Sequence, residues 1–242
     1  KGIFNPGKIT DPLPMKSRLR YTPGLPQRKL TTYFDYPDAG SFLQAVEKCN
    51  GSGDCRKPHS RGGVMCPSYH ASLTENTTTR ARANLLREYL THSPKKNPFD
   101  HPELLEVLDL CLSCKACKSE CPSNVDMARY KAEFLQQYYL SERLPLRARM
   151  IGAYDQFNKW GAIFPPLYNF FVGWKLSSTL IRKMLGFDSR RELPKISHLV
   201  FRRWHKQNLS RLNARISGNR SLVLFMDEFT RYTDVQTGIH TI

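Results

Sequence analysis

The stretch that decides the fold is CLSCKACKSECP, residues 111–122. Its first three cysteines, Cys111, Cys114 and Cys117, recur every third residue, and Cys121 follows directly before Pro122. Three thiolates this close in sequence can bind three irons of one cubane cluster as the chain curls around it, and the displaced fourth thiolate then points toward a second site. A zinc site would instead need two cysteine pairs with a longer spacer between them. The spacing therefore favours iron–sulfur chemistry.

A second, looser group of cysteines lies in CNGSGDCRKPHSRGGVMCPSY, residues 49–69. Cys49, Ser52 and Cys55 keep the every-third-residue spacing with serine in the middle position, and Cys66 again precedes a proline. Ten residues separate Cys55 from Cys66, where the other motif has three. We interpret this group as the same motif with one cysteine lost and seven residues inserted.

The expected ligand sets follow from a property of paired motifs, in which the last cysteine of each run binds the other cluster. The first cluster would then be bound by Cys66, Cys111, Cys114 and Cys117. The second would have only three thiolates, from Cys49, Cys55 and Cys121. A 3Fe–4S cluster, a 4Fe–4S cluster completed by Ser52, Asp54 or His59, and no second cluster all stay open, and each of those three side chains is more simply explained as a polar loop residue.

Basic residues surround both cysteine groups: Arg56, Arg80, Arg82, Arg87, Lys115 and Lys118. Cations near a thiolate-ligated cluster stabilise its negative charge and raise its reduction potential. For Arg82 and Arg87, an exposed helix face explains the sequence equally well. No nucleophile–base pair, nucleotide-binding glycine loop or carboxylate pair stands out, so we expect no catalytic residue in this chain.

The charge of the chain is strongly and unevenly basic. Its 242 residues have a formal net charge of +16, and residues 175–220 contain twelve Lys or Arg but two acids. Such a patch can bind nucleic acid, anionic lipid or an acidic protein, but no nucleic-acid motif accompanies it, and a solvated or docking surface is the simpler interpretation. The seven cysteines do not have the pattern of a disulfide framework, which favours a reducing, cytoplasmic setting. No signal peptide or membrane-spanning segment is expected.

The spacing of apolar residues predicts a mainly α protein. Helices are expected after Ser41, over 77–90, from Pro102, after Asp126, and over 145–158, 166–184 and 197–206, with Gly186 as a stop signal. The run SLVLFMDEF, residues 221–229, is continuously apolar until its acids, and this pattern predicts a buried strand. A lone strand is not stable, so we expect the C-terminal residues to be the start of a longer α/β domain.

Several stretches together resemble a known family. CNGSGDCRK with GGVMCPSY, then TTRARANLLREYL, and then DLCLSCKACKSECPSNVDMARYKAEFL are similar to the iron–sulfur half of bacterial FAD-linked oxidases fused to a ferredoxin and a cysteine-rich domain, which are D-lactate dehydrogenase or glycolate oxidase-like enzymes. The opening KGIFNPGKITDP resembles the end of their flavin domain, and SLVLFMDEFTRYTDVQTGI resembles the start of their cysteine-rich domain. Residues 143–215 match least.

The resemblance implies five parts: an extended arm over 1–40 that ends a flavin domain, an alpha-helical ferredoxin domain over 41–142, a helical extension over 143–206, a loose basic linker over 207–220, and the truncated α/β start over 221–242. It implies an electron-transfer module, not catalytic alone, that connects FAD on a missing N-terminal domain with an unknown acceptor. The substrate would be a D-2-hydroxy acid such as lactate, glycolate or 2-hydroxyglutarate.

The partners that the resemblance implies are the flavin and cysteine-rich domains of the same polypeptide. It also leaves open a peripheral association with the inner face of the membrane, and no nucleic acid is expected. A rival interpretation is a zinc-stapled basic module that binds nucleic acid or an acidic partner, and a third is a purely structural cluster that no longer exchanges electrons.

Overall fold

The computed structural model describes residues 7–8, 11–17, 19, 24–25, 27–214 and 223–242. Every regular element in these residues is helical, which confirms the predicted mainly α class. The chain divides into two compact units, residues 1–143 and 144–242, and the division lies beside the predicted boundary after residue 142.

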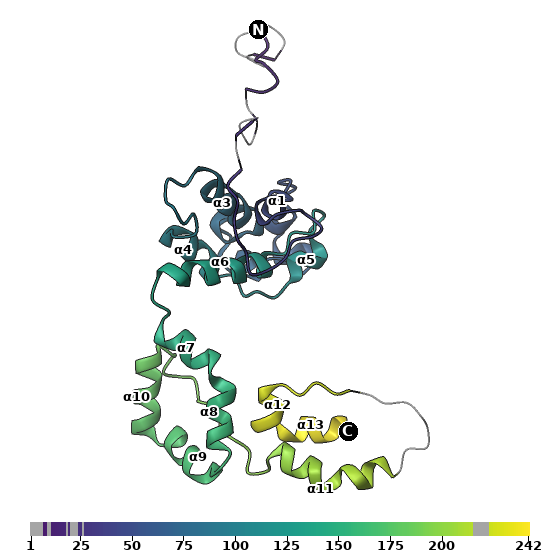
Figure 1. Ribbon diagram of the computed structural model, residues 1–242, viewed down its shortest axis with the longest axis vertical. Coiled ribbons are helices and arrows are strands. Elements are labelled where there is room, and N and C mark those ends of the chain that lie inside the picture. Colours follow the sequence, from purple (N-terminus) through teal and green to yellow (C-terminus); the bar gives the residue numbers. More distant parts are fainter. Residues whose placement is uncertain (1–6, 9–10, 18, 20–23, 26, 215–222) are drawn as a thin grey trace. The chain divides into compact units, whose positions relative to one another are not determined.

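Unit 1 contains six α-helices and three short 3-10 turns within its described residues. The α-helices are α1 (Phe42–Glu47), α2 (Pro67–Ser72), α3 (Thr79–His92), α4 (Pro102–Asp109), α5 (Ala116–Glu120) and α6 (Met127–Ser141). Figure 1 labels five of these helices: α1, α3, α4, α5 and α6. The turns are η1 (Asp54–Arg56), η2 (His59–Arg61) and η3 (Glu75–Thr77). Helix α3 packs against α1, α4 and α6, so it is the central helix of the unit.

The ends of these helices agree with the local signals in the sequence. The Ser41 hydroxyl accepts a hydrogen bond from the backbone N–H of Gln44 at 3.2 Å, and Asp126 accepts one from Arg129 at 3.1 Å. Each of these side chains satisfies an N–H that the helix leaves unpaired. Pro102 is the first residue of α4, as predicted.

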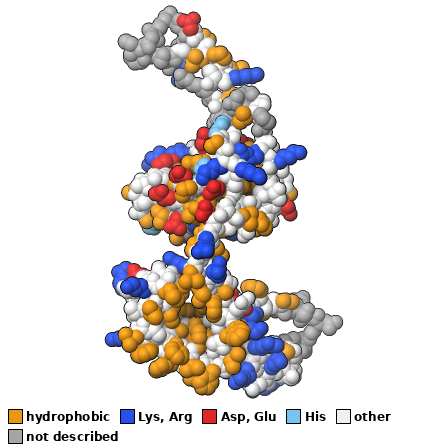
Figure 2. Space-filling view, turned by 60° about the vertical axis from the view of Figure 1, so that its left-hand side comes forward, with side chains coloured by type: hydrophobic (Ala, Val, Ile, Leu, Met, Phe, Trp, Pro, Cys, Tyr) orange, Lys and Arg blue, Asp and Glu red, His pale blue; other side chains and the backbone are white. Residues whose placement is uncertain are grey.

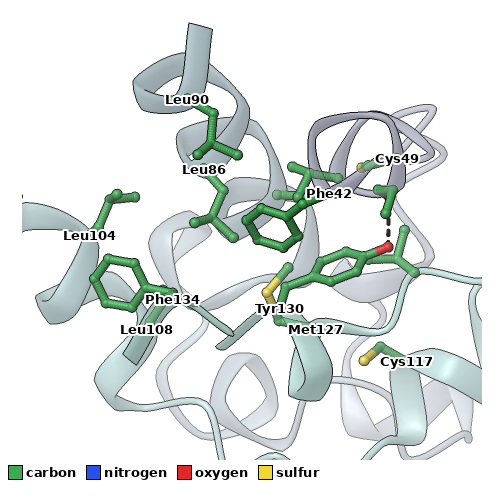
Figure 3. Close-up of a cluster of buried hydrophobic side chains, with 14 of the residues drawn as sticks. Phe42, Cys49, Leu86, Leu90, Leu104, Leu108, Cys117, Met127, Tyr130 and Phe134 are labelled. Carbon is green, nitrogen blue, oxygen red and sulfur yellow. Dashed lines mark hydrogen bonds between the residues drawn. The ribbon is translucent and has the colours of Figure 1, made fainter. Parts of the chain in front are cut away.

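The core of unit 1 is formed by apolar side chains from α1, α3, α4 and α6 (Figure 3). Phe42, Leu86 and Phe134 are at most 2% exposed. The side chain of Tyr130 extends across this core, and its hydroxyl donates a hydrogen bond of 2.6 Å to the carbonyl of Ala45, which lies in α1. The bond satisfies a buried polar group and fixes α6 against α1.

The part of the predicted arm before α1 contacts α6. Glu133, in the middle of α6, is fully buried, and its carboxylate accepts backbone N–H bonds from Tyr33 (3.1 Å) and Phe34 (3.0 Å). The guanidinium of Arg129 lies 5.3 Å from the ring centroid of Phe34 and 4.9 Å from that of Tyr36. Charge-assisted hydrogen bonds and cation–π contacts therefore hold this extended segment on unit 1.

Unit 2 contains seven α-helices in its described residues. They are α7 (Leu146–Gly152), α8 (Tyr154–Gly161), α9 (Pro165–Gly173), α10 (Lys175–Leu185), α11 (Phe201–Asn213), α12 (Glu228–Tyr232) and α13 (Val235–Thr241). The helix predicted over 145–158 is interrupted at Ala153, and the one over 166–184 at Trp174. Gly186 ends α10 in a left-handed conformation (φ 65°), as predicted.

Two predictions for unit 2 are wrong. Residues 223–227 form no strand, and Asp227 caps α12 by accepting a hydrogen bond from the N–H of Thr230 at 2.7 Å; residues 221–222 lie outside the described part. A strand needs a partner, and the described residues contain none. The loose linker predicted over 207–220 is helical up to Asn213, because these residues belong to α11. The inward-facing residues Phe201, Trp204 and Leu212 keep a helical spacing along it. Residues 215–220 lie outside the described part.

No helix in the described ranges is both long enough and apolar enough to cross a membrane.

Candidate metal centre

Four cysteines from two distant parts of unit 1 line one cavity. They are Cys66, Cys111, Cys114 and Cys117, which is the set predicted for the first cluster. Cys66 directly precedes α2, Cys117 lies in α5, and Met127 and Ala128 at the start of α6 form another wall. Figure 3 shows Cys117 at the Tyr130 end of the core, opposite to Leu104.

The backbone around this cavity adopts an unfavourable conformation at three positions. Among the described residues, six non-glycine residues have a positive φ angle, and three of them, Cys66 (58°), Ser113 (53°) and Lys115 (63°), line the cavity. The left-handed conformation costs an ordinary residue about 1–2 kcal/mol. Such outliers concentrate at functional sites, because a site needs a chain path that regular structure does not provide.

The sulfurs of Cys66 and Cys55 lie at the N-terminus of α3. The Sγ of Cys66 accepts the N–H of Thr79 at 3.1 Å and lies 2.8 Å from the Thr79 hydroxyl oxygen. The Sγ of Cys55 accepts the N–H of Arg80 at 3.4 Å. The first N–H groups of a helix carry a partial positive charge, so this position stabilises thiolates.

The two thiols also contact each other, so Cys66 lies at the junction of the two cysteine groups. A hydrogen bond from the Cys66 thiol lowers the pKa of Cys55, and the backbone N–H of Arg80 acts in the same direction. The same bond raises the pKa of Cys66, and burial adds to this effect. This contact places Cys66 between the two groups of cysteines.

The residues expected around the second site differ in how far they are buried. Cys49 and Cys55 are buried and Cys121 is half-buried, and none of the three lines the cavity of the first set. Ser52 is exposed, and hydrogen bonds from Lys57 and Ser52 lower the pKa of Asp54.

The third candidate oxygen or nitrogen ligand, His59, is an exposed residue of η2. Its ring lies 5.9 Å from that of His70, edge to face. Within the part of the chain that the structure describes, no three His, Cys, Asp or Glu side chains converge as they would on a single metal ion. The thiolates of a cubane bind different irons, so they do not need to converge on one point.

The loop inserted between Cys55 and Cys66 is attached to the other cysteine motif by Glu120. This residue ends α5, and its carboxylate accepts the N–H groups of Val64 (2.9 Å) and Met65 (3.0 Å). Gly63 has φ +85°, and a Cβ at this residue would lie 2.9 Å from Glu120 Oε2. The contact fixes the position of Cys66, which follows Met65 directly, relative to α5.

Two buried or half-buried cations lie beside the cavity, and neither is within ion-pair distance of a carboxylate in the described residues. Arg82 is 2% exposed, and lines the cavity with the four cysteines. Lys131 donates hydrogen bonds to the carbonyls of Asp109 (3.0 Å) and Cys111 (2.7 Å), and burial lowers its pKa. A thiolate-ligated cluster is anionic, so these cations and the four thiols fit such a group.

Sequence reasoning missed three of these residues: Glu120, Thr79 and Lys131. Glu120 directly precedes a predicted ligand, and Thr79 lies in the first turn of the helix predicted over 77–90, but neither position reveals a contact with a segment far away in the sequence. For Arg82, the sequence is equally compatible with an exposed helix face, and the burial of this residue excludes that interpretation.

Comparisons with known proteins agree with this geometry. Residues 48–126 match the family model described as a 4Fe–4S dicluster domain. The chain is 28% identical to D-2-hydroxyglutarate dehydrogenase of Pseudomonas putida, with 96% of this chain and 27% of the relative covered. The proteins of the same name from Escherichia coli and Haemophilus influenzae are each 25% identical, with 96% of this chain and 26% of each relative covered.

The chain thus spans about a quarter of the length of these curated relatives. No solved structure matches. The matches confirm the resemblance that the cysteine motifs indicate.

Proposed function

Since residues 48–126 match a 4Fe–4S dicluster domain, we propose that this chain is the electron-transfer module of a flavin-dependent oxidoreductase. The observation that carries the proposal is the single cavity lined by Cys66, Cys111, Cys114 and Cys117. Such a cluster, when bound, accepts and donates single electrons. The chain supplies the four thiolates, the N–H of Thr79 toward Cys66, and the buried charge of Arg82.

We propose a second, incomplete site at Cys49, Cys55 and Cys121. Its support is the paired motif, together with the N–H of Arg80 that the Cys55 sulfur accepts. Ser52 replaces the fourth thiolate, and a serine oxygen is a harder and poorer ligand for this iron. The site would therefore hold a 3Fe–4S cluster or a 4Fe–4S cluster with an exchangeable fourth iron.

The proposed substrate class rests on the relatives. They are D-2-hydroxyglutarate dehydrogenases, which favours 2-hydroxyglutarate over lactate or glycolate. Because the chain spans about a quarter of their length, we place the FAD, the substrate pocket and a cysteine-rich domain in other parts of the same polypeptide. The acceptor is a separate partner, and this chain is not catalytic on its own.

Metal analysis tests the proposal directly. The protein is purified without oxygen, and its iron, acid-labile sulfide and zinc per chain are measured together with its visible spectrum. We expect a brown protein with about four irons and four sulfides at the first site. Cys114→Ser should lower this iron content, and Ser119→Ala, at an exposed position of α5, should not. A colourless protein with stoichiometric zinc would refute the proposal and favour the zinc-stapled binding module.

We also propose a cytoplasmic protein whose unit 2 associates peripherally with the inner face of the membrane. Large apolar side chains are exposed on α8–α10 and in the turn between α8 and α9, among them Trp160 (75%), Ile163 (79%) and Leu180 (67%). Figure 2 shows hydrophobic side chains gathered on this unit. The lysines Lys159 and Lys175 lie on the same helices. Aromatic residues with lysines suit the interface of an anionic bilayer.

Vesicle sedimentation of the full-length protein tests this surface. We expect binding to vesicles with anionic lipid, weaker binding to zwitterionic ones, and a loss of binding in Trp160→Ser. Binding by the isolated chain but not by the full-length protein would assign this face to another domain of the same polypeptide.

A further inference from the structure

Arg82 is a buried cation whose charge the described protein groups do not balance. Its side chain is 2% exposed, its Nε donates to the carbonyl of Val107 at 2.9 Å, and its Nη2 donates to the hydroxyl of Ser68 at 3.1 Å. Both acceptors are neutral, and no carboxylate in the described ranges lies within ion-pair distance. A buried charge without a counter-charge is strongly unfavourable, so an anion is expected beside it.

The surroundings of Arg82 show where this anion would lie. Arg82 lines the cavity of the four cysteines, and it follows Thr79 by three residues on α3, which places both on one face of the helix. Thr79 directs its N–H at the Cys66 sulfur. The first turn of α3 thus presents a backbone dipole and a full positive charge to the same thiols.

A second cation, Lys131, lies near Arg82. The ammonium of Lys131 is attracted by the side chains of Cys111 and Asp109 and repelled more weakly by Arg82, and it donates to the carbonyl of Cys111, a residue that lines the cavity. Its charge therefore lies on the same side of the cavity as that of Arg82, and an anionic group bound by the four cysteines would attract both.

We propose that Arg82 is the fixed counter-charge of the iron–sulfur cluster in this cavity, and that it raises the reduction potential of that cluster. The inference rests on the proposed function. Reduction adds one electron to the cluster, and therefore one negative charge, while the guanidinium stays positive in both states. The attraction is stronger in the reduced state, so removing the guanidinium charge favours the oxidised state.

The experiment compares three variants of the full-length protein by a reductive titration monitored by electron paramagnetic resonance. Arg82→Gln removes the charge, and Arg82→Lys keeps the charge but loses the forked geometry. Arg28→Gln is the matched control, because this arginine also donates to backbone carbonyls, those of Ser93 and Lys95 at 2.9 Å each, but does not line the cavity. Thermal unfolding of each variant is measured in parallel.

We expect the equilibrium of Arg82→Gln to move at least tenfold toward the oxidised cluster, which corresponds to 59 mV for a one-electron couple. Arg82→Lys should stay close to the wild-type potential although it loses hydrogen bonds, and Arg28→Gln should not move. Unchanged potential in Arg82→Gln, with the cluster intact, would overturn the inference. A merely structural role would lower the thermal stability of both Arg82 variants and leave the potentials alike.

Arg82→Lys decides the case if Arg82→Gln binds no cluster. A normal cluster at the wild-type potential would then support the counter-charge, and loss of the cluster in this variant too would overturn it, because the hydrogen bonds would then be what matters. Absence of any cluster from the wild-type protein would refute the proposed function itself, which is a different result from a cluster whose potential ignores Arg82.

Discussion

Removing the Glu120 carboxylate should release the loop before Cys66 from α5. In the wild type this carboxylate accepts two backbone N–H groups, those of Val64 and Met65, at 2.9 and 3.0 Å. Hydrogen bonds to a charged group contribute about 1.5–3 kcal/mol each. Because Glu120 and Val64 are exposed, water replaces part of that energy, and we expect about 1.5–2 kcal/mol in total for Glu120→Ala.

Amide hydrogen exchange measures this loss at the residues concerned. A change of about 1.5–2 kcal/mol in the local opening equilibrium corresponds to roughly 10- to 30-fold faster exchange at Val64 and Met65. Iron bound through Cys66 should also be lost faster to a chelator. Glu106→Ala, on the exposed side of α4, is the matched control and should change neither rate. Exchange at Met65 that stays at the wild-type rate in Glu120→Ala would refute the role assigned to this contact.

Three further changes test other parts of the chain. Ser52→Cys should raise the iron content per chain and remove any oxidised three-iron signal in electron paramagnetic resonance; two complete four-iron clusters in the wild type would contradict the incomplete second site. Glu133→Gln should lower the free energy of unfolding by about 2–3 kcal/mol in urea titrations, because its amide cannot accept all the N–H groups that the carboxylate accepts; a loss no larger than that of Glu142→Gln would contradict this. Burial lowers the pKa of His101, so the unfolded chain begins to bind a proton near pH 6.5 while the folded chain does not, and the stability that neutral His101 provides should be lost as the pH falls through about 6.5. His101→Asn should show a smaller loss over this range in the same titrations, and equal slopes would contradict the assignment.

The helices of unit 1 could be predicted because their signals are local. Ser41 and Asp126 cap helices through side chains a few residues away, and the four-cysteine set follows from spacing within two short segments. The strand predicted after residue 220 failed for the opposite reason. A continuous apolar run is compatible with several structures, and a pairing partner decides between them.

The buried charged residues show a signal that the sequence does contain. Arg82 stands four residues before Leu86 and eight before Leu90, in the stripe that α3 buries. Glu133 likewise lies among the buried residues of α6, directly before Phe134. A charged residue in an apolar register predicts burial, but its partner, a distant backbone segment or an anionic group, becomes visible only in the fold.

Because contacts outside the preceding loop hold Cys66 in place, the length of that loop can vary. The position of its sulfur depends on Glu120 through Met65 and on Thr79, and not on the number of residues that follow Cys55. Residues 56–64 are all exposed, and doubling the length of such a loop costs only about 0.6 kcal/mol in closure entropy. This explains how ten residues can replace the usual three while Cys66 still lines one cavity with Cys111, Cys114 and Cys117. It also makes the tip near Ser60 a place where a reporter tag or a fluorophore can be inserted close to the metal centre while the thiols stay in register.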